Sequence, residues 1–279
     1  MEEKQVFKIG LSSKSNPFSD ELFRSFAEAD IRVMEISNCS DGYDAIDFDN
    51  VKRLADKYGV TLRTFHLPFK THGGISHDIS NPELCEEAVA DLKRHIDIGV
   101  GIGVKIFVLH TSGPKVPVEE RRVWMETCKR NLAELVEYAD KLGAVIALEN
   151  MTHQCLGNTI DEFCELVFSH PKTRVCFDIN HLLYESPGEF IRRIGKRLIT
   201  THVSDCNLEV EQHKLPGEGK IDFWEVLSAL VETGYDGPWV YEVSYKIPQP
   251  VDDKYKLTPK SFVQNANELF AGKTPSKQR

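Results

Sequence analysis

Eight short apolar runs alternate with longer amphipathic segments along almost the whole chain, and this alternation constrains the fold more than any other feature. The runs are seven residues long and rich in Val, Ile and Phe, and several are apolar almost throughout. Such runs are typical of parallel strands that are buried on both faces. They lie at residues 6–12, 31–37, 60–66, 104–110, 144–150, 173–179, 197–203 and 238–244.

Helical patterns fill the intervals between these runs. Apolar residues recur every three to four positions in 83–103 and in 122–143, and Gly143 ends the second segment at a position that favours glycine. The link at 180–196 has the weakest helical pattern. Similar patterns mark 18–29, 46–58, 159–169, 222–233 and 260–270. Eight strands alternating with about eight helices predict an α/β protein with a (β/α)8 TIM barrel.

A doubly wound sheet is the main competing fold. It would normally carry a glycine-rich phosphate-binding turn after its first strand, whereas residues 10–20 read GLSSKSNPFSD. A chain of 279 residues suits one barrel. We therefore predict a single domain over 1–279, with a polar tail from about 271.

Composition limits where the protein is expected to act and which kinds of molecule it is expected to bind. There is no run of about 18 apolar residues to span a membrane, and the start MEEKQVFKIG lacks the pattern of a secretory signal. The seven cysteines include no C-x-x-C pair, which favours reduced thiols and a cytoplasmic protein. The net charge of −9 argues against nucleic acid as a partner, because phosphate backbones select basic surfaces.

Polar residues end six of the predicted strands. The carboxyl ends of barrel strands converge at one mouth, where barrel enzymes carry out their chemistry. We therefore expect these six side chains to meet there. They are His66, His110, Glu149, Asp178, His202 and Glu242.

Three carboxylates at one mouth would repel one another and raise one another's pKa values. A divalent cation removes this repulsion, and carboxylates combined with one imidazole suit Mn²⁺, Zn²⁺, Mg²⁺ or Co²⁺. The residues thus predict one divalent metal ion, with a ligand set made of Glu149, Asp178, His202 and Glu242.

Seven motifs, in order and with barrel spacing, extend from the third strand to the eighth. With them the chain resembles the xylose-isomerase-like barrel superfamily of sugar isomerases and epimerases, which includes the endonuclease IV branch. The motifs are F-H-L-P at 65–68, L-H-T-S-G at 109–113, A-L-E-N at 147–150, F-D-I-N-H at 177–181, T-H-V-S-D at 201–205, H-K-L-P-G-E-G-K-I-D-F at 213–223 and G-P-W-V-Y-E at 237–242.

The resemblance implies roles for individual residues. It implies the same four metal ligands, with Glu149 and Glu242 approaching the substrate from opposite faces. We predict that these two glutamates exchange the substrate proton as catalytic residues, while Asp178 and His202 anchor the metal. The predicted substrate-binding residues are His66, His110, His181, His213, Lys220 and Glu35.

Two segments depart from the patterns of known branches. Residues 150–155 read N-M-T-H-Q-C where ketose 3-epimerases have N-R-x-E, so that substrate specificity does not carry over. The nuclease branch has an Asp-x-His pair that helps to hold a third metal, and here the register gives Glu211-Gln212-His213. Together with His66, His110 and His181 this nearly completes a three-metal set.

These features predict a metal-dependent isomerase or epimerase of a small sugar or polyol, working through an enediolate. An inosose-type dehydratase would use the same intermediate, and an endonuclease IV-like phosphodiesterase is the alternative with several metals. A barrel that binds sugar without turnover is disfavoured by the intact ligand set. The sequence leaves open which sugar is bound, whether it is phosphorylated, and whether the chain forms a homo-oligomer.

Overall fold

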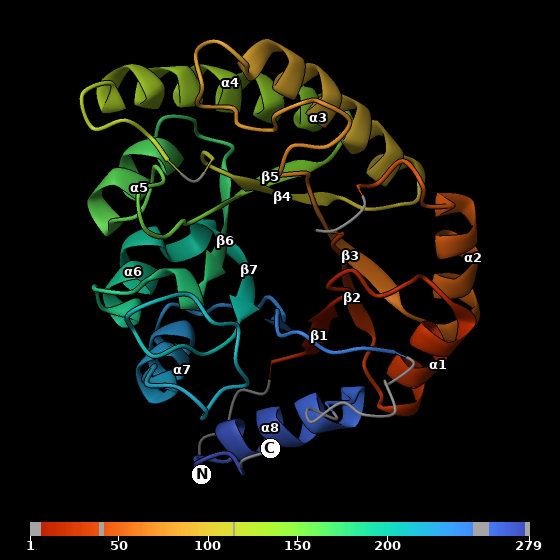
Figure 1. Cartoon of the computed structure of the whole chain (residues 1–279). Coiled ribbons are helices and arrows are strands. Elements are labelled where there is room, and N and C mark those ends of the chain that lie inside the picture. Colours follow the sequence, from red (N-terminus) through yellow and green to blue (C-terminus); the bar gives the residue numbers. More distant parts are fainter. Residues whose placement is uncertain (1–6, 39–41, 114, 248–256, 277–279) are drawn as a thin grey trace.

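Eight parallel strands form a closed barrel in which each strand pairs with its neighbours in sequence and β8 pairs with β1. The computed structural model describes residues 7–38, 42–113, 115–247 and 257–276. Figure 1 shows the strands at the centre of a ring of helices. The predicted barrel is confirmed. The strands are β1 (Ile9–Ser12), β2 (Val33–Ile36), β3 (Thr61–His66), β4 (Ile106–His110), β5 (Val145–Glu149), β6 (Arg174–Asp178), β7 (Leu198–Val203) and β8 (Trp239–Tyr241).

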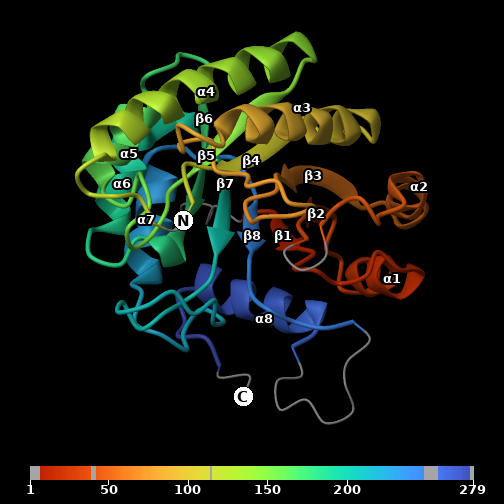
Figure 2. The same ribbon diagram turned by 45° about the horizontal axis from the view of Figure 1, so that its top comes forward.

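One α-helix follows each strand and packs on the outside of the barrel, as the second view also shows (Figure 2). Each helix covers the apolar outer face of the strands with the stripe that its sequence pattern predicted. The helices are α1 (Asp20–Glu28), α2 (Phe48–Tyr58), α3 (Cys85–Gly101), α4 (Arg121–Lys141), α5 (Ile160–Val167), α6 (Pro187–Ile194), α7 (Phe223–Glu232) and α8 (Pro259–Phe270). Among the described residues, no helix combines the length and the apolar character that a bilayer span requires.

The link with the weakest helical pattern contains a short helix between two 3₁₀ turns. The turns are Ile179–His181 and Gly195–Arg197, and they enclose α6. The Ser186 side chain accepts a hydrogen bond from Glu189 N, and Pro187 occupies the first helical position. Both features stabilise a helix start, and they explain why eight residues suffice for a helix here.

Alternation along the strands decides which side chains face the barrel interior. Ile106, Val108, Ala147 and Cys176 form a small apolar cluster that is separate from the main core between strands and helices. Because side chains of a strand alternate between its two faces, the residue two positions after such a layer faces inward as well. This periodicity directs His110, Glu149 and Asp178 into the mouth of the barrel.

A single carboxylate fastens the long loop after β7. The Asp205 side chain accepts hydrogen bonds of 2.8–3.2 Å from four backbone N–H groups of the same loop. Gly219 passes so close that a Cβ atom there would lie 2.2 Å from Asp205 Oδ1, so only glycine fits. The four donors belong to Cys206, Gly217, Gly219 and Ile221.

Candidate active site

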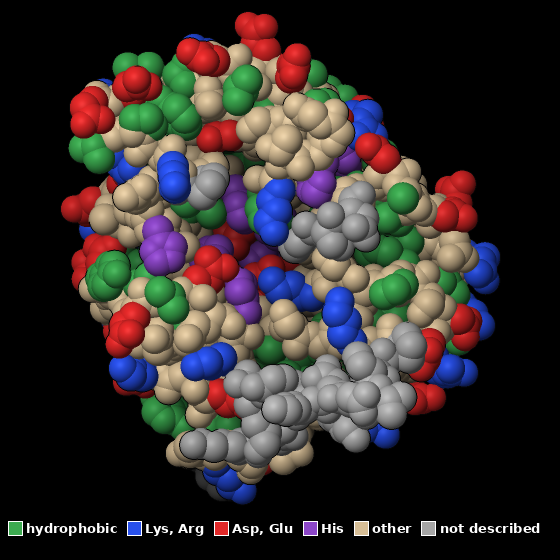
Figure 3. All heavy atoms as spheres, in the orientation of Figure 1, with side chains coloured by type: hydrophobic (Ala, Val, Ile, Leu, Met, Phe, Trp, Pro, Cys, Tyr) green, Lys and Arg blue, Asp and Glu red, His purple; other side chains and the backbone are tan. Residues whose placement is uncertain are grey.

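A pocket of about 470 Å³ opens at the carboxyl ends of the strands. In Figure 3, histidine and acidic side chains gather in the hollow at the centre of this face. Phe69 and Met151 add apolar wall to the pocket. The predicted site residues that line it are His66, His110, Glu149, His181, His213 and Glu242.

The four predicted metal ligands converge at one point. Glu149, Asp178, His202 and Glu242 each offer one ligand atom, and these atoms all lie within 4.8 Å of one another. All four side chains are buried. In the described part of the chain, the buried Asp178 Oδ2 has no hydrogen-bond partner, which is costly unless a cation satisfies it. The residues therefore fit a divalent ion.

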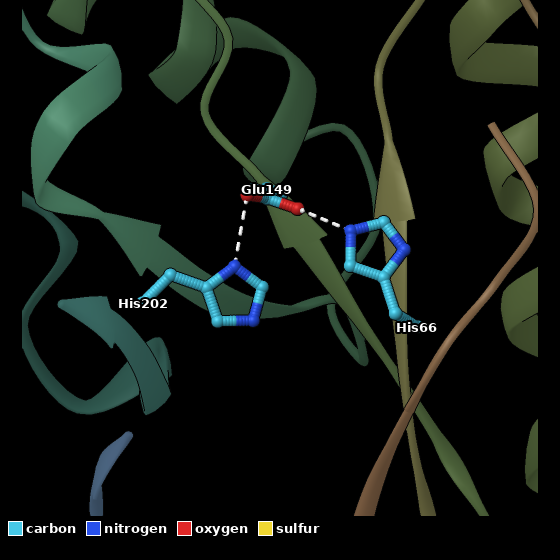
Figure 4. A group of neighbouring side chains, drawn as sticks. All are labelled: His66, Glu149 and His202. Carbon is cyan, nitrogen blue, oxygen red and sulfur yellow. Dashed lines mark hydrogen bonds and ion pairs between the residues drawn. The ribbon is translucent and has the colours of Figure 1, made fainter. Parts of the chain in front are cut away.

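Glu149 is the centre of the cluster. Its Oε1 lies 3.0 Å from His202 Nδ1, and its Oε2 lies 3.2 Å from His66 Nε2 and 3.3 Å from His110 Nε2. Figure 4 shows His66 and His202 directed at this carboxylate from two sides. Burial raises the pKa of Glu149, but the charges of His202 and His110 outweigh burial and hold the pKa well below its usual value. Glu149 is therefore ionised at neutral pH.

The pKa values of the other two carboxylates are shifted in opposite directions. Burial raises the pKa of Asp178 to about 6, and the neighbouring Glu242 and Glu149 add to this rise. Burial also raises the pKa of Glu242, but Lys14 and His202 outweigh it and hold that pKa far below its usual value. Asp178 is thus the first of the three ligand carboxylates to take up a proton as the pH falls.

Asn150 ties the two ligand-bearing strands β5 and β6 together. Its side chain accepts a hydrogen bond of 2.8 Å from Asp178 N and donates one of 2.9 Å to Asp178 O. Its own carbonyl lies 2.8 Å from His181 Nδ1. Sequence reasoning gave Asn150 no role, although the A-L-E-N motif contained it.

Glu35 lies beneath the pocket and does not line it. Its Oε2 is 2.8 Å from His202 Nε2 and accepts a hydrogen bond of 2.9 Å from Thr64 Oγ1. The carboxylate is fully buried behind His202, so the geometry gives no support to the prediction that Glu35 binds substrate. It holds the ring so that Nδ1 faces the other predicted ligands, and carboxylates behind metal-binding histidines usually have this role.

Glu35→Gln is expected to weaken Mn²⁺ binding by about 10–100-fold, because the neutral amide holds the His202 ring less firmly. Calorimetric titration of the metal-free protein with MnCl₂ measures this change. Glu28→Gln, which changes an exposed glutamate at the end of α1, serves as the control. An unchanged affinity in Glu35→Gln would contradict this role for Glu35.

Metal binding is expected to weaken as the pH falls below about 6. A metal held by Asp178 would require the ionised carboxylate, and because its pKa is raised to about 6, Asp178 takes up a proton near that pH. Competition by one proton lowers the affinity by up to about tenfold per pH unit. Titrations with Mn²⁺ between pH 5 and 8, with circular dichroism to monitor folding, test this. Equal affinities at pH 5 and pH 7 would count against it.

A second cluster of possible ligands lies at the rim of the pocket. His181, Glu211 and His213 bring one ligand atom each within 4.8 Å of one another. His213 Nε2 is 2.6 Å from Glu211 Oε1, and His181 Nε2 is 3.6 Å from Glu211 Oε2. Burial lowers the pKa of His181, but Asp178 and Glu211 outweigh burial and raise it to about 10. The structure thus brings together the residues of the nearly complete three-metal set.

The structure places one predicted site residue outside the pocket and adds one that the sequence analysis missed. Lys220 is 64% exposed, lies 3.8 Å from Glu209 and lines a separate surface hollow, so the geometry gives no support to the prediction that it binds substrate. Lys14 was missed: it lines the pocket, and its Nζ lies 3.0 Å from Glu242 Oε1. No motif marks Lys14, because it lies in the loop after β1.

The closed parallel barrel and the ligand cluster at its mouth define an α/β barrel whose candidate active site lies at the carboxyl ends of the strands. The model of the xylose isomerase-like TIM barrel family matches residues 23–261, and the chain belongs to this family.

Two similar proteins and one similar structure can be compared with this chain. An uncharacterized protein of Methanocaldococcus jannaschii is 31% identical over 79% of this chain and 76% of its own length. The inosose isomerase of Bacillus velezensis is 26% identical over 81% of this chain and 86% of its own length. A crystal structure of a D-tagatose 3-epimerase-like protein superposes with a TM-score of 0.77 at 24% identity, covering 95% of this chain and 98% of that one. This last similarity concerns the fold.

Proposed function

We propose that the protein is a metal-dependent isomerase or epimerase that moves a proton on a small sugar or polyol. The observation that carries this proposal is the convergence of Glu149, Asp178, His202 and Glu242 at the base of a pocket of sugar size. The similarity to a protein named inosose isomerase supports the same reaction class.

The chemistry needs a base beside an activated carbonyl. A divalent ion held by the four ligands would polarise the substrate carbonyl and stabilise the charge of the enediolate. Glu149 and Glu242 are both ionised at neutral pH, so either can accept a proton from carbon. Return of the proton to the opposite face inverts a centre, and return to the adjacent carbon isomerises the substrate.

The residues that line the pocket differ from those of ketose 3-epimerases, which supports a different range of substrates. Met151, Thr152 and Cys155 line it in the segment where ketose 3-epimerases have N-R-x-E. These side chains offer no acidic contact for a substrate hydroxyl. The proposal therefore covers inososes and sugar phosphates as well as free ketoses, and loss of a β-hydroxyl from the same enediolate would make the enzyme a dehydratase.

A phosphodiesterase with several metals is the second candidate function. The cluster of His181, Glu211 and His213 favours it. The contacts of His66 and His110 with the Glu149 carboxylate favour it as well. The net charge of −9 speaks against a nucleic-acid substrate.

Two measurements decide between these functions. Elemental analysis of the protein is expected to give about one divalent metal per chain. Ketoses, inososes and their phosphates are then incubated in D₂O and followed by NMR for deuterium at carbon or for dehydration. Three metals per chain, together with cleavage of bis(p-nitrophenyl) phosphate and no deuterium exchange, would replace the isomerase by the phosphodiesterase.

A further inference from the structure

Lys14 places an ammonium group in the pocket wall next to a proposed catalytic carboxylate. Its Nζ lies 3.0 Å from Glu242 Oε1, and its side chain is only 13% exposed. Lysine side chains rarely lie this deep unless they are paired. Lys14 therefore belongs to the interior of the site and not to its solvated rim.

The loop that carries Lys14 is held in an uncommon backbone conformation. Lys14 and Ser15 are consecutive non-glycine residues with φ of 44° and 60°, in the left-handed region. The Ser13 hydroxyl donates to Ser37 O and accepts from Ser37 N, both at 2.8 Å, and the Asn16 side chain donates to Ser13 O at 2.8 Å. Such conformations persist only where the surroundings impose them, and they concentrate at functional sites.

Lys14 contacts the side of Glu242 that faces away from the other ligands. Oε1 of Glu242 is paired with Lys14, whereas Oε2 lies 3.6 Å from His202 Nδ1 and 3.7 Å from His213 Nδ1. A divalent ion would bind between the carboxylates on the His202 side. Lys14 then adds a positive charge beside a site in which the charge of three carboxylates exceeds that of one divalent cation.

We propose that Lys14 is a further catalytic residue, whose ammonium binds a substrate oxygen beside Glu242 and neutralises the negative charge that forms on it. The inference rests on the proposed isomerase or epimerase function. An ammonium carries three N–H donors on one compact charge, so it can contact Glu242 and a substrate oxygen together.

The step balances without a change in the charge of Lys14. The substrate C–H bond breaks, its proton passes to a glutamate carboxylate, and its electron pair moves through the carbonyl group onto the oxygen. Lys14 donates a hydrogen bond to that oxygen and keeps its own proton. When the proton returns to carbon, the negative charge on the oxygen disappears. An ammonium that is already in position before the reaction stabilises the negatively charged oxygen efficiently.

A manganese titration separates this role from simple anchoring of Glu242. If Lys14 is a fixed positive charge beside the metal, Lys14→Met binds Mn²⁺ at least about tenfold more tightly than wild type, because a repulsive charge has been removed. Lys14→Arg, which retains the charge, stays close to wild type. The control is Lys246→Met, on an exposed residue outside the pocket, and it is expected to change nothing. Weaker binding by Lys14→Met would overturn the inference.

Deuterium exchange tests the catalytic part. With a sugar that wild type exchanges, Lys14→Ala is expected to lose at least about 100-fold in kcat with little change in KM. Added ethylammonium should restore part of this rate, because it replaces the missing ammonium group. A variant whose site is misfolded would not be rescued in this way. A rate within threefold of wild type, or no rescue, overturns the role of Lys14 alone. Should wild type exchange none of the sugars, the proposed function fails, while the manganese titration still decides whether Lys14 opposes the metal or anchors Glu242.

Discussion

Glu149→Ala is expected to bind Mn²⁺ at least about 100-fold more weakly than wild type and to catalyse no measurable deuterium exchange. The substitution removes a metal ligand and also the partner of three imidazoles, since His66, His110 and His202 all lie within 3.3 Å of its oxygens. Calorimetric titration and elemental analysis of the purified variant measure the loss.

The matched control for this variant is Glu134→Ala. Glu134 is an exposed glutamate that pairs with Lys93 on the outer helices, and its removal should leave the metal content unchanged. Thermal unfolding of both variants shows whether the barrel is intact. Full retention of metal by Glu149→Ala would refute the assignment of the ligand set.

Glu242→Gln is expected to keep its metal and to lose deuterium exchange by about 10²–10⁴-fold, the usual contribution of a positioned base. The amide oxygen still offers a ligand atom of the same size, but it cannot take up a proton from carbon. The measurement is the rate of deuterium incorporation into a substrate of the wild-type enzyme, at saturating Mn²⁺.

Glu209→Gln provides the comparison, because Glu209 is an exposed acid that does not line the pocket. It should exchange deuterium at the wild-type rate. Exchange by Glu242→Gln at that same rate would contradict the proton transfer assigned to Glu242. Loss of the metal itself would instead show that the charge of Glu242 is needed for binding.

The fold could be predicted because its signal is local. Each strand shows as an apolar run and each helix as an amphipathic stripe, and eight repeats leave few arrangements other than a closed barrel. The observed strands are shorter than the runs: β8, for example, covers Trp239–Tyr241 of the predicted 238–244. Residues that flank a strand stay buried under loops, so burial alone does not mark where pairing ends.

The inward-facing residues of the site could be predicted for the same reason. His110, Glu149 and Asp178 follow buried residues at a spacing of two, which fixes their direction. Glu35 also faces inward, but it lies deeper in the barrel than His66. The register pairs Glu35 with Thr64, two residues before His66, after an irregularity in β2. Register between strands is a property of the assembled sheet and cannot be read from one strand.

Residues on loops could not be placed from the sequence. Lys14 enters the pocket because buried hydrogen bonds of Ser13 and Asn16 shape its loop, and Lys220 leaves it because the loop after Gly219 turns outward to the surface. The path of a loop depends on contacts between distant segments, and local pattern does not encode these contacts.

The fastening of the loop after β7 by Asp205 separates two parts of the site. Glu211 and His213 belong to the segment that this carboxylate closes, whereas Glu149 and Asp178 end strands of the barrel. The third residue of the rim cluster, His181, lies in the 3₁₀ turn after β6, so the rim cluster spans the loop and the barrel. Exchanging residues 207–214 would therefore replace Glu211 and His213 without changing the strands that carry Glu149 and Asp178.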